Sequence, residues 1–221
     1  MPTSACRLVK VGTLRFAHPT HLTTDKPRMT ISDRIRIKSV RPLSNGHFKL
    51  NAVTFDWRRD DGQWQSQQRE VLDRGDAAAL LPYNVAQRTV VLVKQFRYPA
   101  YANGHDDLLI EAAAGLLDDA PPEERTRAEA EEETGYRLHE VRKIFEAYMS
   151  PGAITEKIHF FVAEYEPSMR VSDGGGLADE GEEIEVLEFS IDEALAMIAD
   201  VRICDAKTIL LLQHAALKIF R

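Results

Sequence analysis

Three glutamates at helical spacing carry the strongest chemical signal in this sequence of 221 residues. Glu129, Glu132 and Glu133 lie in the run AEAEEETGY, and positions three or four apart share one face of a helix. Carboxylates that share a small volume repel one another and raise one another's pKa values unless a cation lies among them. Mg²⁺ usually divides its coordination among carboxylates, waters and substrate phosphates. The cluster therefore predicts a metal site for phosphate chemistry, against the plainer alternative of a solvated acidic helix face.

The residues around the cluster predict a helix from about Pro122 to Thr134. Proline is tolerated in a first helical turn, and Glu123 and Glu124 suit the positive end of the helix dipole. Gly135 fits the left-handed position that commonly ends a helix. Residues 118–133 hold eight acids and two bases, so most of the net charge of −7 comes from this one segment.

Residues 115–136, GLLDDAPPEERTRAEAEEETGY, resemble the signature of the Nudix hydrolases. That signature is a glycine and a spaced glutamate, followed by Arg-Glu-apolar-any-Glu-Glu-any-Gly-apolar. Ala128 stands where the family has its arginine, and the loop before the helix is one residue shorter than usual. Because the family's arginine positions neighbouring carboxylates, Arg125 and Arg127 are the candidates to compensate for its loss.

Further segments, in order along the chain, make the resemblance more specific. They are REVLDRGDAAALLPYN, VVLVKQFRYPAYANG, IEAAAGLLDD, FEAYMSPGAITEKIHFFVAEY and EIEVLEF. Together they resemble the nucleoside-diphosphate-sugar branch of the family over residues 30–217. Within that branch the chain is similar to the GDP-mannose pyrophosphatases, which share the shortened loop.

The fold class implied is α+β, a Nudix fold with a mixed sheet sandwiched between helices and an N-terminal antiparallel β-strand unit. We expect residues 1–29 to form a disordered extension, residues 30–75 a strand unit for dimerisation, and residues 76–221 the Nudix domain. Residues 173–176, DGGG, predict a mobile loop. Ser190 and Asp205 predict the caps of two closing helices.

Alternation and apolar runs predict nine strands. Their ranges are 35–40, 48–57, 65–72, 77–83, 89–96, 108–114, 141–148, 158–165 and 184–189. A slip in phase between Leu50 and Val53 predicts a bulge in the second of them. Asp60, Asp61 and Gly62 predict the hairpin turn that follows.

The resemblance implies Mg²⁺ as the cofactor, with Mn²⁺ as a substitute. Glu129, Glu133 and the backbone carbonyl of Ala114 are the implied ligands, and Glu132 is either a third ligand or a support. In this branch a loop glutamate completes the site as a ligand or acts as a base.

That loop acid lies in the segment DEGEEIEV. The candidates are Asp179, Glu180, Glu182 and Glu183. Counting back from the strand that follows favours Glu182 over Glu180, and both stay open.

The resemblance also implies a set of substrate contacts. These are His47, Gln68, Arg69, Glu70, Arg97, Gly115, Leu116, Glu156 and Lys207. Arg97 matches a phosphate-contacting position, where a guanidinium fork suits a diphosphate. Residues 68–70 match a segment that reaches the nucleotide across a dimer interface, so a homodimer with strand exchange is expected. His47 stands where relatives place an aromatic ring that stacks on the base.

The implied reaction is hydrolysis of GDP-mannose to GMP and mannose 1-phosphate. The turn at Ser150, Pro151 and Gly152 is also typical of ADP-ribose pyrophosphatases, which give AMP and ribose 5-phosphate. A non-catalytic sensor that binds a nucleotide sugar is the third alternative. The metal site alone does not choose among them, and the base, the sugar, the number of metal ions and the phosphorus attacked stay open.

Composition narrows the partners and the compartment. A net charge of −7 argues against nucleic acid, whose binding proteins are usually basic. No run approaches the roughly 18 apolar residues of a membrane span, and residues 1–30 lack the apolar core of a signal peptide. Cys6 and Cys204 have no metal spacing and predict free thiols. We therefore expect a cytoplasmic enzyme with neither a nucleic-acid nor a membrane partner.

Overall fold

The computed structural model describes residues 30–117, 121–177 and 181–221. The extension expected over residues 1–29 lies outside the described residues, as do Asp179 and Glu180. Among the helices of the described residues, none combines the length and the apolar character needed to cross a membrane. The strands divide between two separate sheets.

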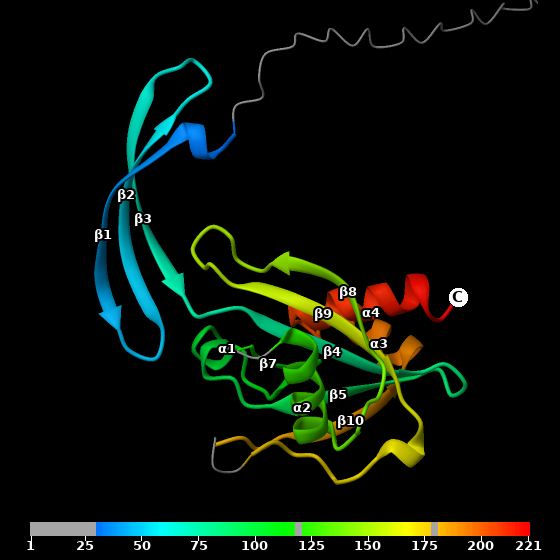
Figure 1. Cartoon of the computed structure of the whole chain (residues 1–221). Helices are drawn as coiled ribbons and strands as arrows, with labels where there is room; N and C mark the ends of the chain where they lie inside the picture. The colour runs from blue at the N-terminus through cyan, green and yellow to red at the C-terminus, as the bar shows by residue number, and fades with distance from the viewer. Residues whose placement is uncertain (1–29, 118–120, 178–180) are drawn as a thin grey trace, which may run out of the picture.

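The N-terminal sheet has three antiparallel strands and projects from the rest of the molecule (Figure 1). A short 3-10 helix, η1 (Ser32–Arg34), precedes β1 (Ile35–Asn45), β2 (Lys49–Arg58) and β3 (Trp64–Asp73). The predicted hairpin turn is confirmed, since Gly62 has a φ of 82° and donates to the carbonyl of Arg59. The predicted bulge in the second strand is wrong. The register shifts lie in the pairing of β1 with β2, where β1 has the extra residues Lys38 and Leu43, while β2 pairs regularly with β3.

The second sheet has seven strands and begins only four residues after β3 ends. Five of them form the order β10-β5-β4-β9-β8, with β6 beside β5 and β7 beside β4. Only β4 and β9 pair in parallel, which makes the sheet mixed as expected. The bounds are β4 (Ala77–Asn84), β5 (Thr89–Gln95), β6 (Leu109–Glu111), β7 (Ala113–Leu116), β8 (Val141–Tyr148), β9 (Lys157–Glu164) and β10 (Glu185–Ser190).

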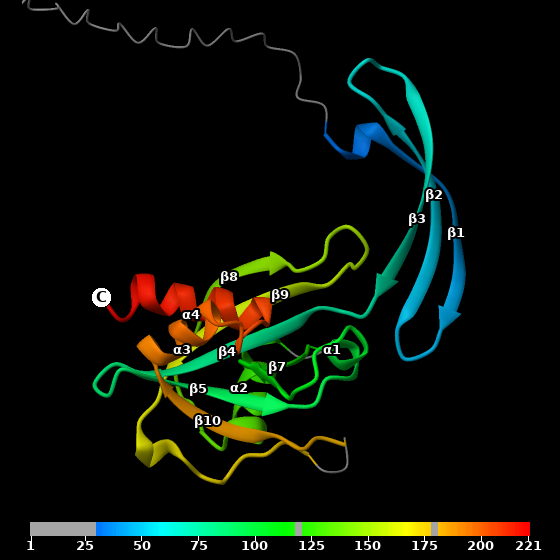
Figure 2. The same ribbon diagram turned by 180° about the vertical axis from the view of Figure 1, so that it is seen from behind.

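Helices cover both faces of this sheet (Figures 1 and 2). α2 (Pro122–Thr134) lies on one face, where Ala130 packs with buried residues such as Phe161 and Tyr165. α3 (Ile191–Ala199) and α4 (Ala206–Lys218) lie on the other face. Leu211 and Leu212 of α4 are fully buried there. Because both faces are covered, the central strands are almost continuously apolar, as the sequence indicates.

The single strand expected over residues 108–114 is two short strands, β6 and β7. β4 and β5 pair directly only near their shared turn, at Tyr83 with Val90 and at Asn84 with Thr89. Beyond that point they diverge, so β6 pairs with β5 and β7 pairs with β4. The crossing from one to the other at Ala112 brings Ala114 and Gly115 beside the second half of α2, where they meet Glu133 and Glu129.

The helix ends follow the predicted chemistry. Gly135 ends α2 in the left-handed conformation with a φ of 78°. Ser190 Oγ accepts from the amide of Glu193, and Asp205 Oδ2 accepts from the amide of Thr208. α1 (Tyr98–Ala102) and η2 (Pro167–Met169) have too few residues to show a helical period, and the sequence did not indicate them.

Candidate active site

Helix α2 turns Glu133 inward rather than toward solvent. Thr126, Ala130 and Glu133 lie on its buried side, and Glu133 is only 1% exposed. The amide of Ala114 in β7 donates to Glu133 Oε2 at 3.2 Å. A single donor does not offset the free-energy cost of burying a carboxylate. A residue with a purely structural role is rarely found in such a position.

Electrostatics link Glu133 to two other acids. Burial is the main reason that the pKa of Glu133 is raised to about 8, and the charges of Glu129 and Glu182 add to the effect. The Ala114 amide and the Arg97 guanidinium act in the opposite direction. Raised carboxyl pKa values caused by burial and like charge are characteristic of functional sites.

Glu129 lies one helical turn before Glu133, against the backbone of β7. A Cβ atom at Gly115 would stand 2.0 Å from Glu129 Oε1, so a side chain at position 115 would displace this carboxylate from its place. Arg125 contacts Glu129 Oε1 at 2.5 Å, whereas Arg127 pairs with Glu123 at 2.6 Å. Of the two arginines considered as replacements for the one missing at position 128, Arg125 is therefore the one that contacts the cluster.

Glu182 reaches the cluster from the segment before β10. The amide of Leu177 donates to Glu182 Oε2 at 3.0 Å. The glycines before it are tied to the end of α2, since Gly175 and Gly176 donate to the carbonyls of Glu133 and Glu132 at 3.0 and 3.1 Å. Gly174, Gly175 and Gly176 all have positive φ. The loop expected to be mobile is thus anchored to the helix that carries the acids.

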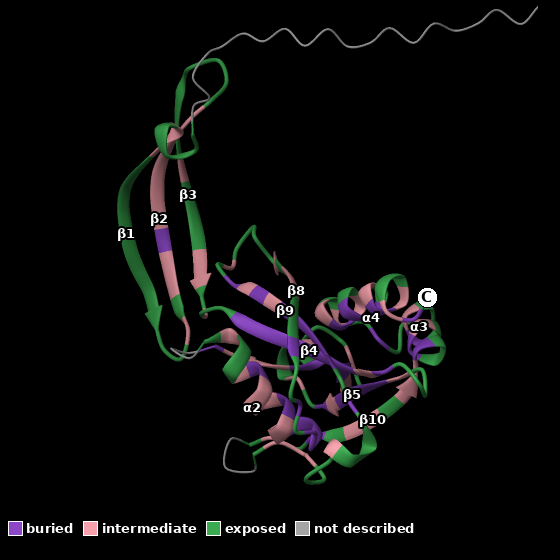
Figure 3. Cartoon of the chain, turned by 45° about the vertical axis from the view of Figure 1, so that its right-hand side comes forward, coloured by how far each residue is buried: buried purple, intermediate pink, exposed green. Residues whose placement is uncertain are grey.

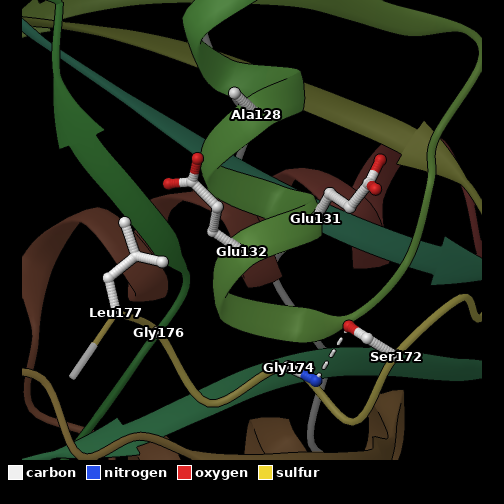
Figure 4. A pocket seen from close by; sticks show the side chains of 7 residues that line it. All are labelled: Ala128, Glu131, Glu132, Ser172, Gly174, Gly176 and Leu177. Carbon is white, nitrogen blue, oxygen red and sulfur yellow. Dashed lines mark hydrogen bonds between the residues drawn. The ribbon is translucent and has the colours of Figure 1, made fainter. Parts of the chain in front are cut away.

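Glu132 points in another direction. It lines an open pocket of about 510 Å³, and Figure 4 shows its side chain on the same side of α2 as Leu177, opposite Glu131. The pocket is also lined by Ala128, Ser172, Gly174 and Gly176. Of the three predicted carboxylates, Glu129 therefore interacts electrostatically with Glu133, as does Glu182, while Glu132 lines the neighbouring pocket.

Among the described residues, no three His, Cys, Asp or Glu side chains are already arranged around a single point as metal ligands. Glu129 is instead held by Arg125. The donor set itself is suited to a hard divalent cation, because it consists of carboxylate and backbone oxygens.

Two predicted substrate contacts meet at a residue to which the sequence assigned no role. Glu111, the last residue of β6, is 2% exposed. Arg97 Nε donates to Glu111 Oε1 at 2.7 Å, and Lys207 Nζ donates to its other oxygen. The available signal was its position as the single charge in the apolar run 108–114.

The remaining predicted contacts lie on or near the N-terminal sheet. His47, Gln68, Arg69 and Glu70 are all exposed there (Figure 3). The sheet joins the body through the end of β3, where Leu72 exchanges hydrogen bonds with Ala153 and Thr155. Nearby, Glu156 is buried and pairs with Arg74 at 3.3 Å. Within one chain the structure brings Arg97 and Gly115 near the acids, joins Lys207 to Arg97 through Glu111, and leaves the four residues of the projecting sheet apart.

Comparison with known proteins identifies the family of this chain. A family described as the GDP-mannose pyrophosphatase NudK N-terminal domain matches residues 34–72, which lie in the projecting sheet. A GDP-mannose pyrophosphatase of Pectobacterium atrosepticum is 52% identical over 189 residues, covering 85% of this chain and 97% of that protein. The chain belongs to the GDP-mannose pyrophosphatase family of Nudix hydrolases. The resemblance inferred from the sequence is thereby confirmed.

A second member of the family, from Yersinia enterocolitica, is 53% identical over 184 residues, covering 82% of this chain and 95% of that protein. A solved structure, the crystal structure of an ADP compounds hydrolase, superposes with a TM-score of 0.64 at 16% identity. The superposition covers 85% of this chain and 97% of the solved chain. At 16% identity it shows only that the two share a fold. The predicted α+β Nudix fold with an N-terminal antiparallel unit is confirmed.

Proposed function

We propose that this Nudix hydrolase cleaves the pyrophosphate bond of nucleotide sugars, converting GDP-mannose to GMP and mannose 1-phosphate. The observation that carries the proposal is the buried Glu133, whose pKa is raised by burial and by Glu129 and Glu182, beside the guanidinium of Arg97. Relatives that are about half identical over most of the chain and are named GDP-mannose pyrophosphatases support the substrate.

The proposal includes Mg²⁺, or Mn²⁺ in its place. Glu133 fits that role because its carboxylate is almost fully buried and is repelled by the charges of Glu129 and Glu182. A divalent cation would offset this repulsion. Glu129, Glu133, Glu182 and the Ala114 carbonyl would hold the ion. When bound, it would neutralise the oxygens of the diphosphate and lower the pKa of a water molecule.

The chain's own residues have distinct parts in this reaction. Arg97 and Lys207 bind and orient the negatively charged diphosphate. Gly115 and Leu116 give the substrate close access to the backbone of β7, because a side chain at position 115 would meet Glu129. Glu182 supports the cluster or accepts the proton of the attacking water, and Glu132 flanks it. Glu156 is placed on the sugar side.

The proposal also includes a homodimer in which the sheet of residues 30–75 completes the partner's site. Its exposed apolar side chains, including Ile37, Val40 and Trp64, support a covering surface from a second copy. Charge supports the same occupant, because residues 30–75 contain nine Lys or Arg and six Asp or Glu, whereas residues 76–221 contain 14 and 28. In that arrangement His47, Gln68, Arg69 and Glu70 reach the nucleotide of the partner. Light scattering coupled to size exclusion tests the mass, and a single chain's mass contradicts it.

ADP-ribose is the second candidate substrate. The turn at Ser150, Pro151 and Gly152 favours it, and this turn lies beside the end of β3, where Ala153 bonds to Leu72. Both substrates place a diphosphate between a nucleoside and a sugar, so the acidic cluster serves either. The third candidate, a non-catalytic sensor, is disfavoured because all the helix carboxylates are retained.

A substrate panel tests the proposal. Purified protein is incubated with Mg²⁺ and GDP-mannose, GDP-glucose, ADP-ribose, ADP-glucose or a dinucleotide, and the products are identified by mass spectrometry. We expect GMP and mannose 1-phosphate to form with the highest kcat/KM. A higher kcat/KM with ADP-ribose selects the second candidate, and binding without cleavage of any substrate selects the sensor.

A further inference from the structure

Glu111 is a buried carboxylate held between two cations. It is 2% exposed on β6, with Arg97 Nε on one oxygen and Lys207 Nζ on the other. The two cations come from segments more than 100 residues apart in sequence, the start of α1 and the first turn of α4. A single carboxylate therefore fixes where both positive groups stand.

The first turn of α4 holds this arrangement from the other side. Lys207 also contacts Asp205 Oδ1 at 3.0 Å, and Asp205 caps the helix through Thr208. Thr208 Oγ1 in turn accepts from the amide of Ala112, the residue after Glu111, at 2.7 Å. Main chain and side chain at positions 111 and 112 are thus both fastened to α4, two residues before Ala114.

Arg97 experiences competing attractions. Besides Glu111, the carboxylates of Glu133 and Glu182 favour its charged form. Its side chain is 41% exposed, and its contact with Glu111 uses Nε, so the outer nitrogens of the guanidinium take no part in that hydrogen bond. A guanidinium released from Glu111 would move toward the two acids that the proposed metal ion needs.

We propose that Glu111 is a positioning residue that holds Arg97 and Lys207 as a paired receptor for a diphosphate and keeps Arg97 away from Glu133 and Glu182. This inference rests on the proposed hydrolysis of nucleotide sugars and deepens it. Glu111 itself contacts neither the substrate nor the ion. Its removal therefore affects binding of both without removing a reacting group.

The Glu111→Gln variant tests the inference. We expect the KM for GDP-mannose and the Mg²⁺ concentration for half-maximal activity each to rise about tenfold, the usual scale for a lost charged hydrogen bond, while kcat changes much less. In an Arg97→Gln background the same substitution should have a smaller effect than in the wild type, because one of the two residues through which it acts is absent. The matched control is Glu146→Gln, since Glu146 also accepts from two cations, Lys143 and Lys157, and we expect it to leave all three constants unchanged.

Two further measurements separate the possible failures. Glu111→Asp keeps the charge but retracts it by one methylene, and it should raise KM even if Glu111→Gln does not fold. Calorimetry with Mn²⁺ and inorganic pyrophosphate, which requires no turnover, should show weaker binding of both to either folded variant. If the wild type cleaves no nucleotide sugar yet these affinities fall, the proposed function is wrong and the positioning role stands. Unchanged KM and unchanged affinities in a folded variant, or additive effects in the Arg97→Gln background, overturn the positioning role.

Discussion

The two sheets of this molecule contrast in how they are stabilised. In the seven-stranded sheet, β4, β5 and β9 are buried by helices on both faces. In the three-stranded sheet, every residue of β1 after Ile35 is exposed, and Ala52 is the one buried residue among β1, β2 and β3 (Figure 3). Strands that bury so little rarely stand alone. The body therefore has a core of its own, whereas the exposed projecting sheet fits the proposed contact with a second copy of the chain.

The contrast extends to charge. Among the described residues of the body, the carboxylates of Glu111, Glu133 and Glu156 are buried. Within the projecting sheet Asp60 is accessible and pairs with Arg34 at 2.8 Å. Equivalent substitutions in the two regions should therefore have unequal consequences, and the predictions below use that inequality.

The largest difference is expected between Glu133→Gln and Glu70→Gln. Glu133→Gln removes the central member of the buried cluster, so turnover with Mg²⁺ should fall at least about 1,000-fold. Glu70→Gln changes an exposed side chain and should act mainly on KM. Steady-state kinetics on GDP-mannose measure both, and circular dichroism checks that both variants fold. Substantial turnover in Glu133→Gln contradicts the proposed site.

The second prediction concerns the exposed apolar surface of β1. Val40→Lys should leave the chain folded, because Val40 is 57% exposed, but it should dissociate the dimer and lower kcat/KM about 10- to 100-fold. Leu217→Lys on α4 is the control, because Leu217 is equally accessible but lies on the body. Light scattering and kinetics distinguish the outcomes. Equal masses and equal activities for the two variants would mean that the sheet has no partner in solution.

The third prediction is a pH dependence confined to the body. The pKa of Glu133 is raised from 4.5 to about 8 in the folded metal-free protein, so the folded state holds this proton more tightly than the unfolded state. The resulting stability is fully present below pH 4.5 and is lost as the pH rises toward 8.

Thermal unfolding in EDTA across this pH range measures the effect. The melting temperature of the wild type should fall relative to that of Glu133→Gln as the pH rises, and Mg²⁺ should reverse the fall. Burial lowers the pKa values of His159 and His214, but the wild type and the variant both contain these histidines, so their contribution cancels. If the melting temperatures of the two proteins change with pH in parallel, ionisation of Glu133 does not reduce the free energy of unfolding.

The same contrast explains what could be predicted from the sequence. The bounds of α2 were predictable because Pro122 and Gly135 mark its ends by local chemistry. β4 and β9 were predictable because burial on both faces leaves a continuous apolar run. The division of β6 from β7 was not, because it depends on the divergence of β4 from β5, which no local pattern records.

The site divides in the same way. The spacing of Glu129 and Glu133 along one helix is enough to predict that they lie close together. The contact of Glu111 with Lys207 joins residues 96 apart, and spacing carries no information about it. The glycines at 174–176 look mobile by composition, yet their positive φ values serve to bond the loop to the end of α2.

The smallest expected differences compare three basic residues. Arg127→Gln removes an exposed pair with Glu123, and Arg59→Gln removes an exposed pair with Asp61 in the projecting sheet. Exposed pairs contribute little, so each should change kcat/KM less than about twofold. Arg125→Gln has the same chemistry but acts on Glu129 inside the site, and it should lower kcat several-fold while Arg125→Lys restores part of the loss. If none of the three substitutions changes kcat or kcat/KM, the acidic cluster keeps its geometry without an arginine. Arg125 would then not compensate for the family arginine that is missing at position 128.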